Sequence, residues 1–306
     1  MKVIPKVFIV CGVYNNLSYS KRLMSCIAVQ KYPNIKTIII DDGSDDGTPE
    51  YLSDNYPDTV ILKGNGNLWW TGSLYWGVNE VSKIAKMHDF ILTLNNDCTF
   101  GRDYIQILVK TALRNDRTIV GSLVISELNK LEIIDAGVKI DWAKGKLIAQ
   151  GPQLMTQLTK NKTNNDDIDT LSTKGTLYPV EVFGEIGNFD KFHLPHYTSD
   201  YEFACRAKKS GYKLLIDYTA KIYNDQKHTG LGLKVADKMS IIELYNLLFN
   251  RKSRINISDK YWFIKLCCPL KYQITNYLIL IFKTIVLFTH LFPLSVIYTL
   301  RKIRRA

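Results

Sequence analysis

Cysteine is scarce in this chain of 306 residues, and none of it has the spacing of a metal site. The six cysteines form no C-x-x-C pair and no Cys/His zinc pattern. Cys11 and Cys98 fall in or beside apolar runs, where cysteine usually packs as a small hydrophobic residue. This pattern argues against a zinc site, and we expect reduced thiols in a cytoplasmic protein.

A cleavable leader is also missing from the N-terminal residues. Residues 1–10 hold two lysines and one short apolar run, without a small-residue cleavage site. Hydrophobic residues make up 46% of the chain, which is enough for a full core, and we find no internal repeat. We therefore expect a folded protein of one or two domains on the cytoplasmic side of a membrane.

Acidic residues are almost absent from residues 251–306. This segment carries eleven of the 40 Lys and Arg residues but only one of the 29 acids, Asp259. The rest of the chain is nearly neutral, so the formal net charge of +11 belongs to the tail. Because the tail is also the most apolar part, the charge favours an anionic membrane surface over nucleic acid as the partner.

The tail from Tyr261 to Ala306 predicts helices at a membrane. Its longest stretch without formal charge, Thr284–Leu300, has seventeen residues. That is the lower limit for a spanning helix, about 17–25 residues. We favour helices that lie in the membrane interface. A single span and an oligomerisation face, as in a homodimer, are the alternatives.

Short apolar runs alternate with helical patterns in the first half of the chain. The runs are continuous, which is typical of parallel strands buried on both faces. They are Val7–Tyr14, Thr37–Ile40, Thr59–Leu62, Phe90–Leu94 and Thr118–Ile125. Helices are predicted over Leu17–Gln30, from Thr48, and from Leu74 to Ala85. Alternating strands and helices predict an α/β fold.

Two later segments bear on the domain organisation: one is a loop inside the first domain, and the other begins the second. Gln153–Lys174 is polar and has no period, so we expect a mobile loop or surface excursion there. Ala236–Arg251 repeats apolar residues at helical spacing. We therefore place one domain at residues 1–235 and basic, apolar helices at 236–306.

Acids follow two of the predicted strands directly. Asp41–Thr48 follows the run that ends at Ile40, and Asn95–Asp97 follows the run that ends at Leu94. In an open α/β sheet, ligands bind beyond the carboxyl ends of the strands. The acids of the first segment can accept hydrogen bonds from a base or from ribose hydroxyls, although a solvated acidic turn is the alternative.

A calcium loop does not fit the first segment. If Asp42, Ser44 and Asp46 were ligands, the twelfth position would be Ser53, where a bidentate Glu is needed. Asp97 is the better metal candidate, because one hard anionic ligand leaves room for phosphate oxygens on a divalent ion. A turn or helix cap is the alternative for Asp97.

A third polar segment, Thr198–Arg206, predicts the start of a helix. It places Asp200 in the first turn and allows Glu202 to pair with Arg206 at i,i+4. A carboxylate at the mouth of a cleft can deprotonate an acceptor hydroxyl, which makes Asp200 a candidate base. A simple N-cap at Ser199 or Asp200 is the alternative.

These segments, in this order, resemble the family 2 glycosyltransferases of the GT-A fold, particularly the bacterial rhamnosyltransferase-like group. The resemblance covers about Val7–His228. It implies a Rossmann-like, mostly parallel sheet flanked by helices. By resemblance, Asp41–Ser44 is similar to a DDGS turn, Asn95–Asp97 takes the place of a DxD motif, and Asp200 follows a G-x-F-D element at Gly187–Asp190.

The resemblance also implies roles for particular residues. The nucleotide-sugar site would use Val13, Tyr14, Asp42, Ser44, Asn67, Trp70 and Asn96. Asp97 and His228 would hold Mn²⁺ or Mg²⁺, and Asp200 would act as the base. Three departures stand out: Asn95 replaces the first acid of DxD, Ser199 replaces the acid before the base, and Tyr75 stands where relatives commonly have Asn.

The implied function is inverting transfer of a sugar from a dTDP- or UDP-linked donor to a lipid-linked saccharide at the inner face of the cell membrane. dTDP-rhamnose is the first expectation, followed by UDP-hexoses and UDP-galactofuranose. A sugar nucleotidyltransferase would need a basic Gly-rich phosphate loop, and Cys11–Asn15 is not one. An inactive membrane-bound scaffold with the same fold is the other alternative.

Overall fold

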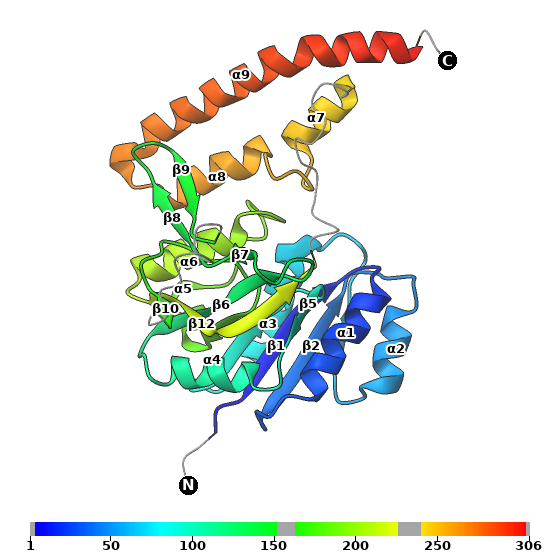
Figure 1. Cartoon of the computed structure of the whole chain (residues 1–306), viewed down its shortest axis with the longest axis vertical. Helices are drawn as coiled ribbons and strands as arrows, with labels where there is room; N and C mark the ends of the chain where they lie inside the picture. The colour runs from blue at the N-terminus through cyan, green and yellow to red at the C-terminus, as the bar shows by residue number, and fades with distance from the viewer. Residues whose placement is uncertain (1–3, 152–162, 226–239, 304–306) are drawn as a thin grey trace.

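The structure is a computed structural model that describes residues 4–151, 163–225 and 240–303 (Figure 1). The strands are β1 Val7–Val13, β2 Ile35–Asp41, β3 Val60–Lys63, β4 Phe90–Thr93, β5 Cys98–Phe100, β6 Thr118–Ser126, β7 Ile133–Asp135, β8 Val138–Asp141, β9 Lys146–Ala149, β10 Asn164–Asn165, β11 Thr176–Pro179 and β12 Lys213–Asn224. The helices are α1 Leu17–Ala28, α2 Thr48–Asn55, α3 Trp69–Ser82, α4 Tyr104–Ala112, α5 Glu181–Ile186, α6 Ser199–Lys209, α7 Ile241–Phe249, α8 Ile257–Cys267 and α9 Leu270–Ile303.

The central sheet is mixed and mostly parallel, as predicted. Its strands run in the order β10-β12-β6-β11-β4-β1-β2-β3, with β5 on β12 and β7 on β6. The pairs β1–β2, β1–β4, β2–β3 and β6–β12 are parallel, whereas β11 runs antiparallel between β4 and β6. All five predicted strands are present, so the α/β expectation is confirmed.

Successive residues of β1 explain why its apolar run is continuous. Val7, Ile9 and Cys11 belong to a core cluster shared with α1, α2 and α4, whereas Phe8 and Val10 belong to a second cluster shared with α3, α5 and α6. Both faces of the sheet are therefore covered by helices. The sequence of β1 does not alternate between apolar and polar residues, because its side chains are buried on both faces. Figure 1 shows α1 and α4 on the nearer side of this sheet.

A glycine sets the close approach of α3 to the sheet. A Cβ atom on Gly77 would lie 2.5 Å from Cγ1 of Val10 and 2.7 Å from Cδ1 of Ile40. Both side chains are buried in the core. Helix α3 is therefore packed directly against β1 and β2. This contact fixes its first turn relative to the ends of these strands.

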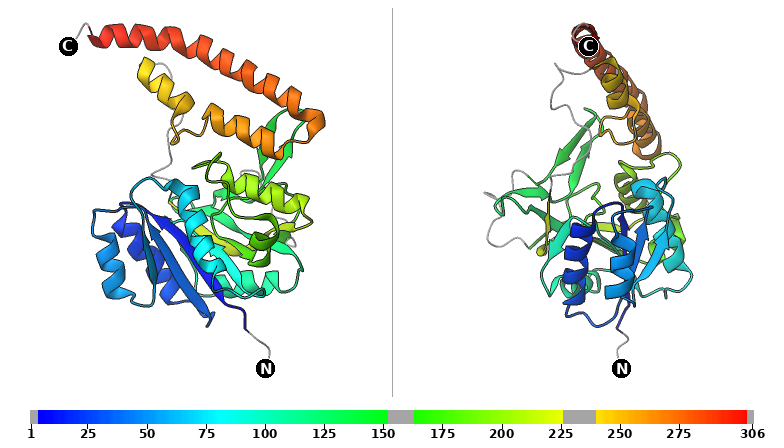
Figure 2. Two further views of the ribbon diagram at one scale, coloured as in Figure 1. Left: turned by 180° about the vertical axis from the view of Figure 1, so that it is seen from behind. Right: turned by 90° about the vertical axis from the view of Figure 1, so that its right-hand side faces the viewer.

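The C-terminal helices form a further layer at the end of the molecule away from the N-terminus (Figure 2). The long helix α9 runs across α7 and α8, and α8 packs on α6. The hairpin β8–β9 reaches this layer, where Trp142 stacks on Phe263 with ring centroids 5.7 Å apart. The predicted boundary between residues 235 and 236 lies outside the described residues.

Helix α9 is apolar and largely exposed. Leu270–Thr289 is long and apolar enough to cross a membrane, and 6% of its residues are buried. Its exposed large side chains include Leu270, Ile274, Leu278, Ile281, Phe282 and Ile285. An exposed apolar stripe of this size marks an interaction surface. The structure thus has one apolar C-terminal helix of the predicted kind.

Candidate functional site

Three of the predicted site residues, Tyr14, Asp42 and Asn96, follow the ends of parallel strands. Val13 pairs with Asp41 across β1 and β2, and Val10 pairs with Thr93 across β1 and β4. The residues that follow these strands therefore meet at the same edge of the sheet. This edge is where α/β folds bind their ligands.

The carboxylate of Asp42 organises the loop between β3 and α3. Its Oδ1 accepts a hydrogen bond from the N–H of Gly66 at 2.9 Å, and its Oδ2 accepts from the N–H groups of Leu68 and Trp69 at 3.0 and 3.1 Å. Asp42 is 7% exposed. A carboxylate at a helix N-terminus is favoured by the helix dipole. Asp42 therefore holds in place the loop that contains Asn67 and the start of α3, which carries Trp70. Its contact with a nucleotide base stays a prediction.

The DDGS turn is fixed to the end of β1. The Ser44 hydroxyl donates to the Asp41 carboxylate and accepts from the N–H of Asn15 at 2.9 Å. The Asn15 side chain in turn accepts from the N–H of Asp45. Beside this turn the side chain of Tyr14 is 58% exposed, so its ring is free to lie against a ligand.

The two adjacent tryptophans take different positions, which the sequence left open. The Trp70 indole Nε1–H donates to the Thr173 hydroxyl at 3.1 Å. Trp69 has a φ of +60°, and its ring lies edge-on to His196 with centroids 5.7 Å apart. A bulky residue at positive φ is strained, and such strain is concentrated at functional sites. Both rings are half-buried.

Asp97 is half-buried beyond β4, next to Asn96. Burial raises the pKa of its carboxyl above the ordinary value, whereas the charge of Lys174 and a hydrogen bond from Asn224 lower it. Oδ1 of Asn95 is buried and accepts no hydrogen bond. Both observations fit a cation, because Mg²⁺ and Mn²⁺ prefer oxygen ligands and a cation offsets the cost of burying a carboxylate.

Protein ligands beyond these are sparse in the described part of the chain. Residues 4–151, 163–225 and 240–303 contain no cluster of three His, Cys, Asp or Glu side chains around one point. His228, the second predicted ligand, lies outside the described residues. The donor set fits a metal ion that takes much of its coordination from substrate phosphate oxygens.

Asp200 is the second residue of α6 and lies half-buried at the site. Burial, followed by the charge of Asp135, raises its pKa to about 6, while the N–H groups of Tyr201 and Thr173 and the charge of Lys174 lower it. The N-cap position is Thr198, which makes no side-chain cap bond. Asp200 is thus not the N-cap, and a carboxyl with this pKa can accept a proton near neutral pH.

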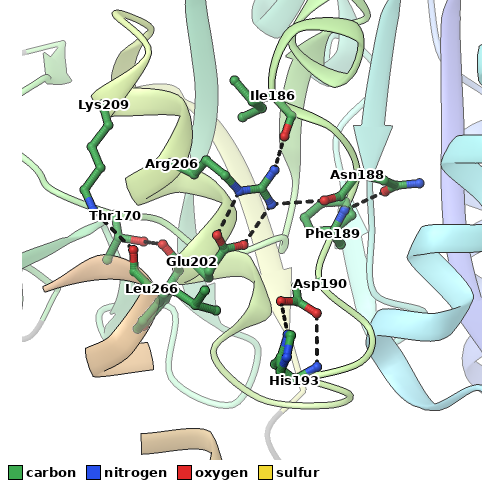
Figure 3. A network of polar contacts seen from close by, with 11 residues as sticks. Thr170, Ile186, Asn188, Phe189, Asp190, His193, Glu202, Arg206, Lys209 and Leu266 are labelled. Carbon is green, nitrogen blue, oxygen red and sulfur yellow. Dashed lines mark hydrogen bonds and ion pairs between the residues drawn. The ribbon is translucent and has the colours of Figure 1, made fainter. Parts of the chain in front are cut away.

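An ion pair inside α6 fixes the helix that carries Asp200 (Figure 3). Arg206 donates to both carboxylate oxygens of Glu202 at 2.8 Å, as the i,i+4 spacing predicted. The same guanidinium donates to the backbone carbonyls of Ile186 and Asn188. Because Glu202 is 4% exposed, this network ties α6 to the turn after α5 with little competition from water.

The G-x-F-D element forms a local turn. Asp190 accepts from the N–H groups of Phe192 and His193 and pairs with Nδ1 of His193 at 2.7 Å (Figure 3). The His193 ring lies 3.8 Å from that of Trp262 in α8, centroid to centroid. This element therefore positions the chain before α6 and connects it to the C-terminal layer.

Lys174 is a site residue that sequence reasoning missed. Its charge lowers the pKa of both Asp97 and Asp200, and its Nζ donates to Oδ1 of Asn224 at 3.3 Å. The expectation of a mobile or surface segment up to Lys174 is wrong for its last residues. Thr173 is 2% exposed, and its carbonyl accepts from the Thr93 hydroxyl at 2.8 Å.

A glycine after this lysine was the available signal. Gly175 has a φ of +71°, and a Cβ atom there would lie 2.2 Å from the Tyr104 hydroxyl. A glycine with that conformation just before an apolar run indicates a tight entry into a strand, here β11. The polar composition of the segment concealed it.

The sheet order and the site at its edge define the GT-A glycosyltransferase fold. The mannosyltransferase PcManGT from Pyrobaculum calidifontis, in complex with GDP-Man and Mn²⁺, superposes with a TM-score of 0.51 at 15% identity, over 73% of this chain and 57% of that one. GalNAc-T7 with UDP, GalNAc and Mn²⁺ gives 0.57 at 16% identity, over 86% and 51%. The chain thus matches little more than half of each solved structure.

Residues 8–187, more than half of the chain, match glycosyl transferase family 2, and the chain belongs to that family. The N-acetylglucosaminyl-diphospho-decaprenol L-rhamnosyltransferase of Mycobacterium tuberculosis is 20% identical over 237 residues. The match covers 72% of this chain and 76% of the relative. The similarity to a rhamnosyltransferase-like group is therefore confirmed.

Replacing Asp200 with Asn should lower sugar transfer at least tenfold, which corresponds to about 1.4 kcal/mol in the barrier. The raised pKa means that ionised Asp200 destabilises the folded state, so stability is lost as pH rises from 3.8 through about 6. Asp200→Asn should therefore gain more thermal stability over wild type at pH 8 than at pH 4. Transfer above a tenth of the wild-type rate would remove Asp200 from the role of base.

Replacing Lys174 with Met should move the acid limb of the pH–rate profile to higher pH. The lysine lowers the pKa of Asp200, which Asp135 and Tyr201 also face, so its removal raises that pKa. From a pKa of about 6, a rise of half a pH unit would lower kcat/KM about twofold at pH 6 and hardly at all at pH 8. Lys110→Met, on the exposed face of α4, is the matched control, and an equal loss at both pH values would contradict the assignment.

Proposed function

We propose that this protein is an inverting glycosyltransferase that moves a sugar from a nucleoside-diphosphate donor to a hydroxyl of a lipid-linked saccharide. The observation that carries the proposal is that Asp97 and Asp200, two half-buried carboxyls of a GT-A fold, both lie near enough to Lys174 for its charge to lower their pKa. Membership of glycosyl transferase family 2 supports the reaction class. The relative from Mycobacterium tuberculosis supports the acceptor class, because its name specifies a sugar on diphospho-decaprenol.

The described residues at this edge of the sheet would have different roles in binding the donor. Asp42 and Ser44 hold the loops around the nucleotide, and the exposed Tyr14 ring and the end of β1 at Val13 would lie against the base. Trp70, held by its hydrogen bond to Thr173, would lie against the donor. Asn67 is exposed in the loop that Asp42 fixes. Positioning of this kind contributes a large part of enzymatic rate enhancement.

In the proposed step, Asp200 takes the proton of the acceptor hydroxyl. The freed oxygen forms a bond to the anomeric carbon, and the bond from that carbon to the diphosphate breaks, with the electron pair leaving on the diphosphate. Attack from the face opposite the leaving group inverts the configuration. Lys174, whose charge acts on both carboxyls, would add positive charge next to the developing negative charge.

Asp97, together with His228 and the orphaned amide oxygen of Asn95, would hold a divalent ion, Mn²⁺ or Mg²⁺. Such an ion, when bound, neutralises the charge of the departing diphosphate. Both solved relatives contain Mn²⁺, which supports the choice of metal. dTDP-rhamnose is the first donor to test, followed by UDP-hexoses and UDP-galactofuranose.

The purified protein should bind dTDP or UDP in calorimetry only when Mn²⁺ is present, and Asp97→Ala should lose this metal-dependent binding. Asp103→Ala, an exposed acid that pairs with Lys31, is the control and should bind as wild type does. Undiminished binding by Asp97→Ala would remove Asp97 from the metal site. A folded wild-type protein that binds neither nucleotide would favour the inactive scaffold.

We also propose that the tail holds the enzyme at the inner face of the membrane as a peripheral protein of the cytoplasm. Support comes from the exposed apolar stripe of α9 and from exposed Ile242, Tyr245 and Phe249 on α7. The eleven basic residues of segment 251–306 suit anionic lipid headgroups. Apolar burial combined with this charge is the usual basis of interfacial binding.

Replacing Ile274, Leu278 and Phe282 together with Gln should move the protein from the membrane to the soluble fraction on cell fractionation. The three side chains are 75%, 61% and 66% exposed, so their loss removes contact area and not core packing. Leu128→Gln with Leu131→Gln, two exposed leucines outside the tail, is the control. An unchanged distribution would assign the stripe to assembly between copies.

A further inference from the structure

A cavity of about 510 Å³ lies away from the proposed donor site, between the β8–β9 hairpin and helices α8 and α9. Its size falls within the range of small-molecule sites, roughly 300–1,000 Å³. Most of the lining is apolar, and three lysines, Lys146, Lys260 and Lys283, are set into it. None of the lining residues is acidic. The cavity thus combines a large apolar surface with an excess of positive charge.

The walls of this cavity are held by specific contacts. Trp142 stacks on Phe263, and the Asn276 side-chain amide donates to the Trp142 carbonyl at 2.7 Å. A Cβ atom on Gly145 would lie 3.1 Å from Oδ1 of Asn276, so the hairpin turn and α9 are in close approach. A wall fixed in this way loses little freedom on binding, which favours a preformed site.

Two of the lysines are placed where they could bind an anion. Lys283 donates to the carbonyl of Gly145 at 3.4 Å, which places its ammonium group beside the hairpin turn. Burial lowers the pKa of Lys260, which the charge of Asp259 partly offsets. A partly desolvated ammonium group gains more from an anionic partner than one in water. A phosphate would supply that partner without an acid from the lining.

The cavity is close to the helix of the candidate base. Phe263, in its wall, packs in one apolar cluster with Tyr201 and Cys205 of α6. Tyr201 follows Asp200 in the chain. On the other side, α9 forms both the cavity wall and the exposed apolar stripe. The cavity therefore lies between the surface proposed to face the membrane and the helix proposed to deprotonate the acceptor.

We propose that this cavity binds the phosphate end of the acceptor's polyisoprenoid lipid, with Lys260 and Lys283 on the phosphate and the apolar wall on the first isoprenoid units. The proposal rests on the proposed transfer to a lipid-linked saccharide. A bulk phospholipid has no need to be near α6, whereas a lipid-linked acceptor must keep its phosphate near the sugar that reaches Asp200. The position of the cavity thus favours the acceptor lipid.

The test is equilibrium binding of radiolabelled decaprenyl phosphate to the full chain in detergent micelles. Lys260→Gln with Lys283→Gln should weaken binding at least tenfold, whereas Lys265→Gln with Lys271→Gln, two lysines of the same helices outside the lining, should not. Leu280→Trp should block the cavity. Leu131→Trp, 73% exposed and outside both the tail and the cavity lining, is the control for added bulk.

Three results would overturn the proposal. The first is wild-type affinity in both the lysine and the Leu280 variants, and the second is no binding by the wild type. The third is equal displacement of the probe by phosphatidylglycerol, which would make the cavity a general anionic-lipid site. Mn²⁺-dependent binding of dTDP or UDP, measured on the same samples, separates this inference from the proposed function. A failure confined to the lipid leaves the transferase proposal standing.

Discussion

The carboxylate of Asp42 is the contact on which the geometry of the site depends. It sits at the end of β2 and accepts three backbone N–H groups from the start of α3 and the loop before it. Because Gly77 lets the same helix lie directly on β1 and β2, the helix is fixed at both its first turn and its middle. Loss of this anchor would release Trp69 and Trp70 together, which makes Asp42 a structural residue whatever it contacts in the donor.

The acceptor side of the site is held by a second, independent set of contacts. The Glu202–Arg206 pair binds α6 to the carbonyls of Ile186 and Asn188. On the opposite side, the segment that ends at Lys174 is fixed by the Thr93 hydroxyl and the Trp70 indole. Asp200 is thus positioned by one element and lies near the charge of another. Burial, followed by the charge of Asp135, raises its pKa to about 6, and the charge of Lys174 limits that rise.

The C-terminal helices lie between the candidate site and the exposed apolar stripe of α9. His193 against Trp262 and Phe263 against Trp142 join α8 to the turn before α6 and to the β8–β9 hairpin. The helices are therefore packed on the sheet domain through aromatic contacts, while the outer stripe of α9 stays apolar and exposed. The elements around the lysine-lined cavity would lie between a membrane at that stripe and the base on α6. In the proposed arrangement, an acceptor lipid is held in this cavity.

The sequence alone determined the α/β class, the five strands and the acids beyond β2 and β4. Continuous apolar runs and the acids that follow them are local patterns, so they can be recognised without knowing any long-range contact. The sequence also placed Asp200 in the first turn of a helix and paired Glu202 with Arg206. Only the tertiary structure decided that Asp42 caps α3, that the charge of Lys174 acts on both Asp97 and Asp200, and that the hairpin and α9 line a cavity. These features depend on residues 24 to 134 positions apart, and such long-range contacts form only when the sheet and its covering helices are assembled.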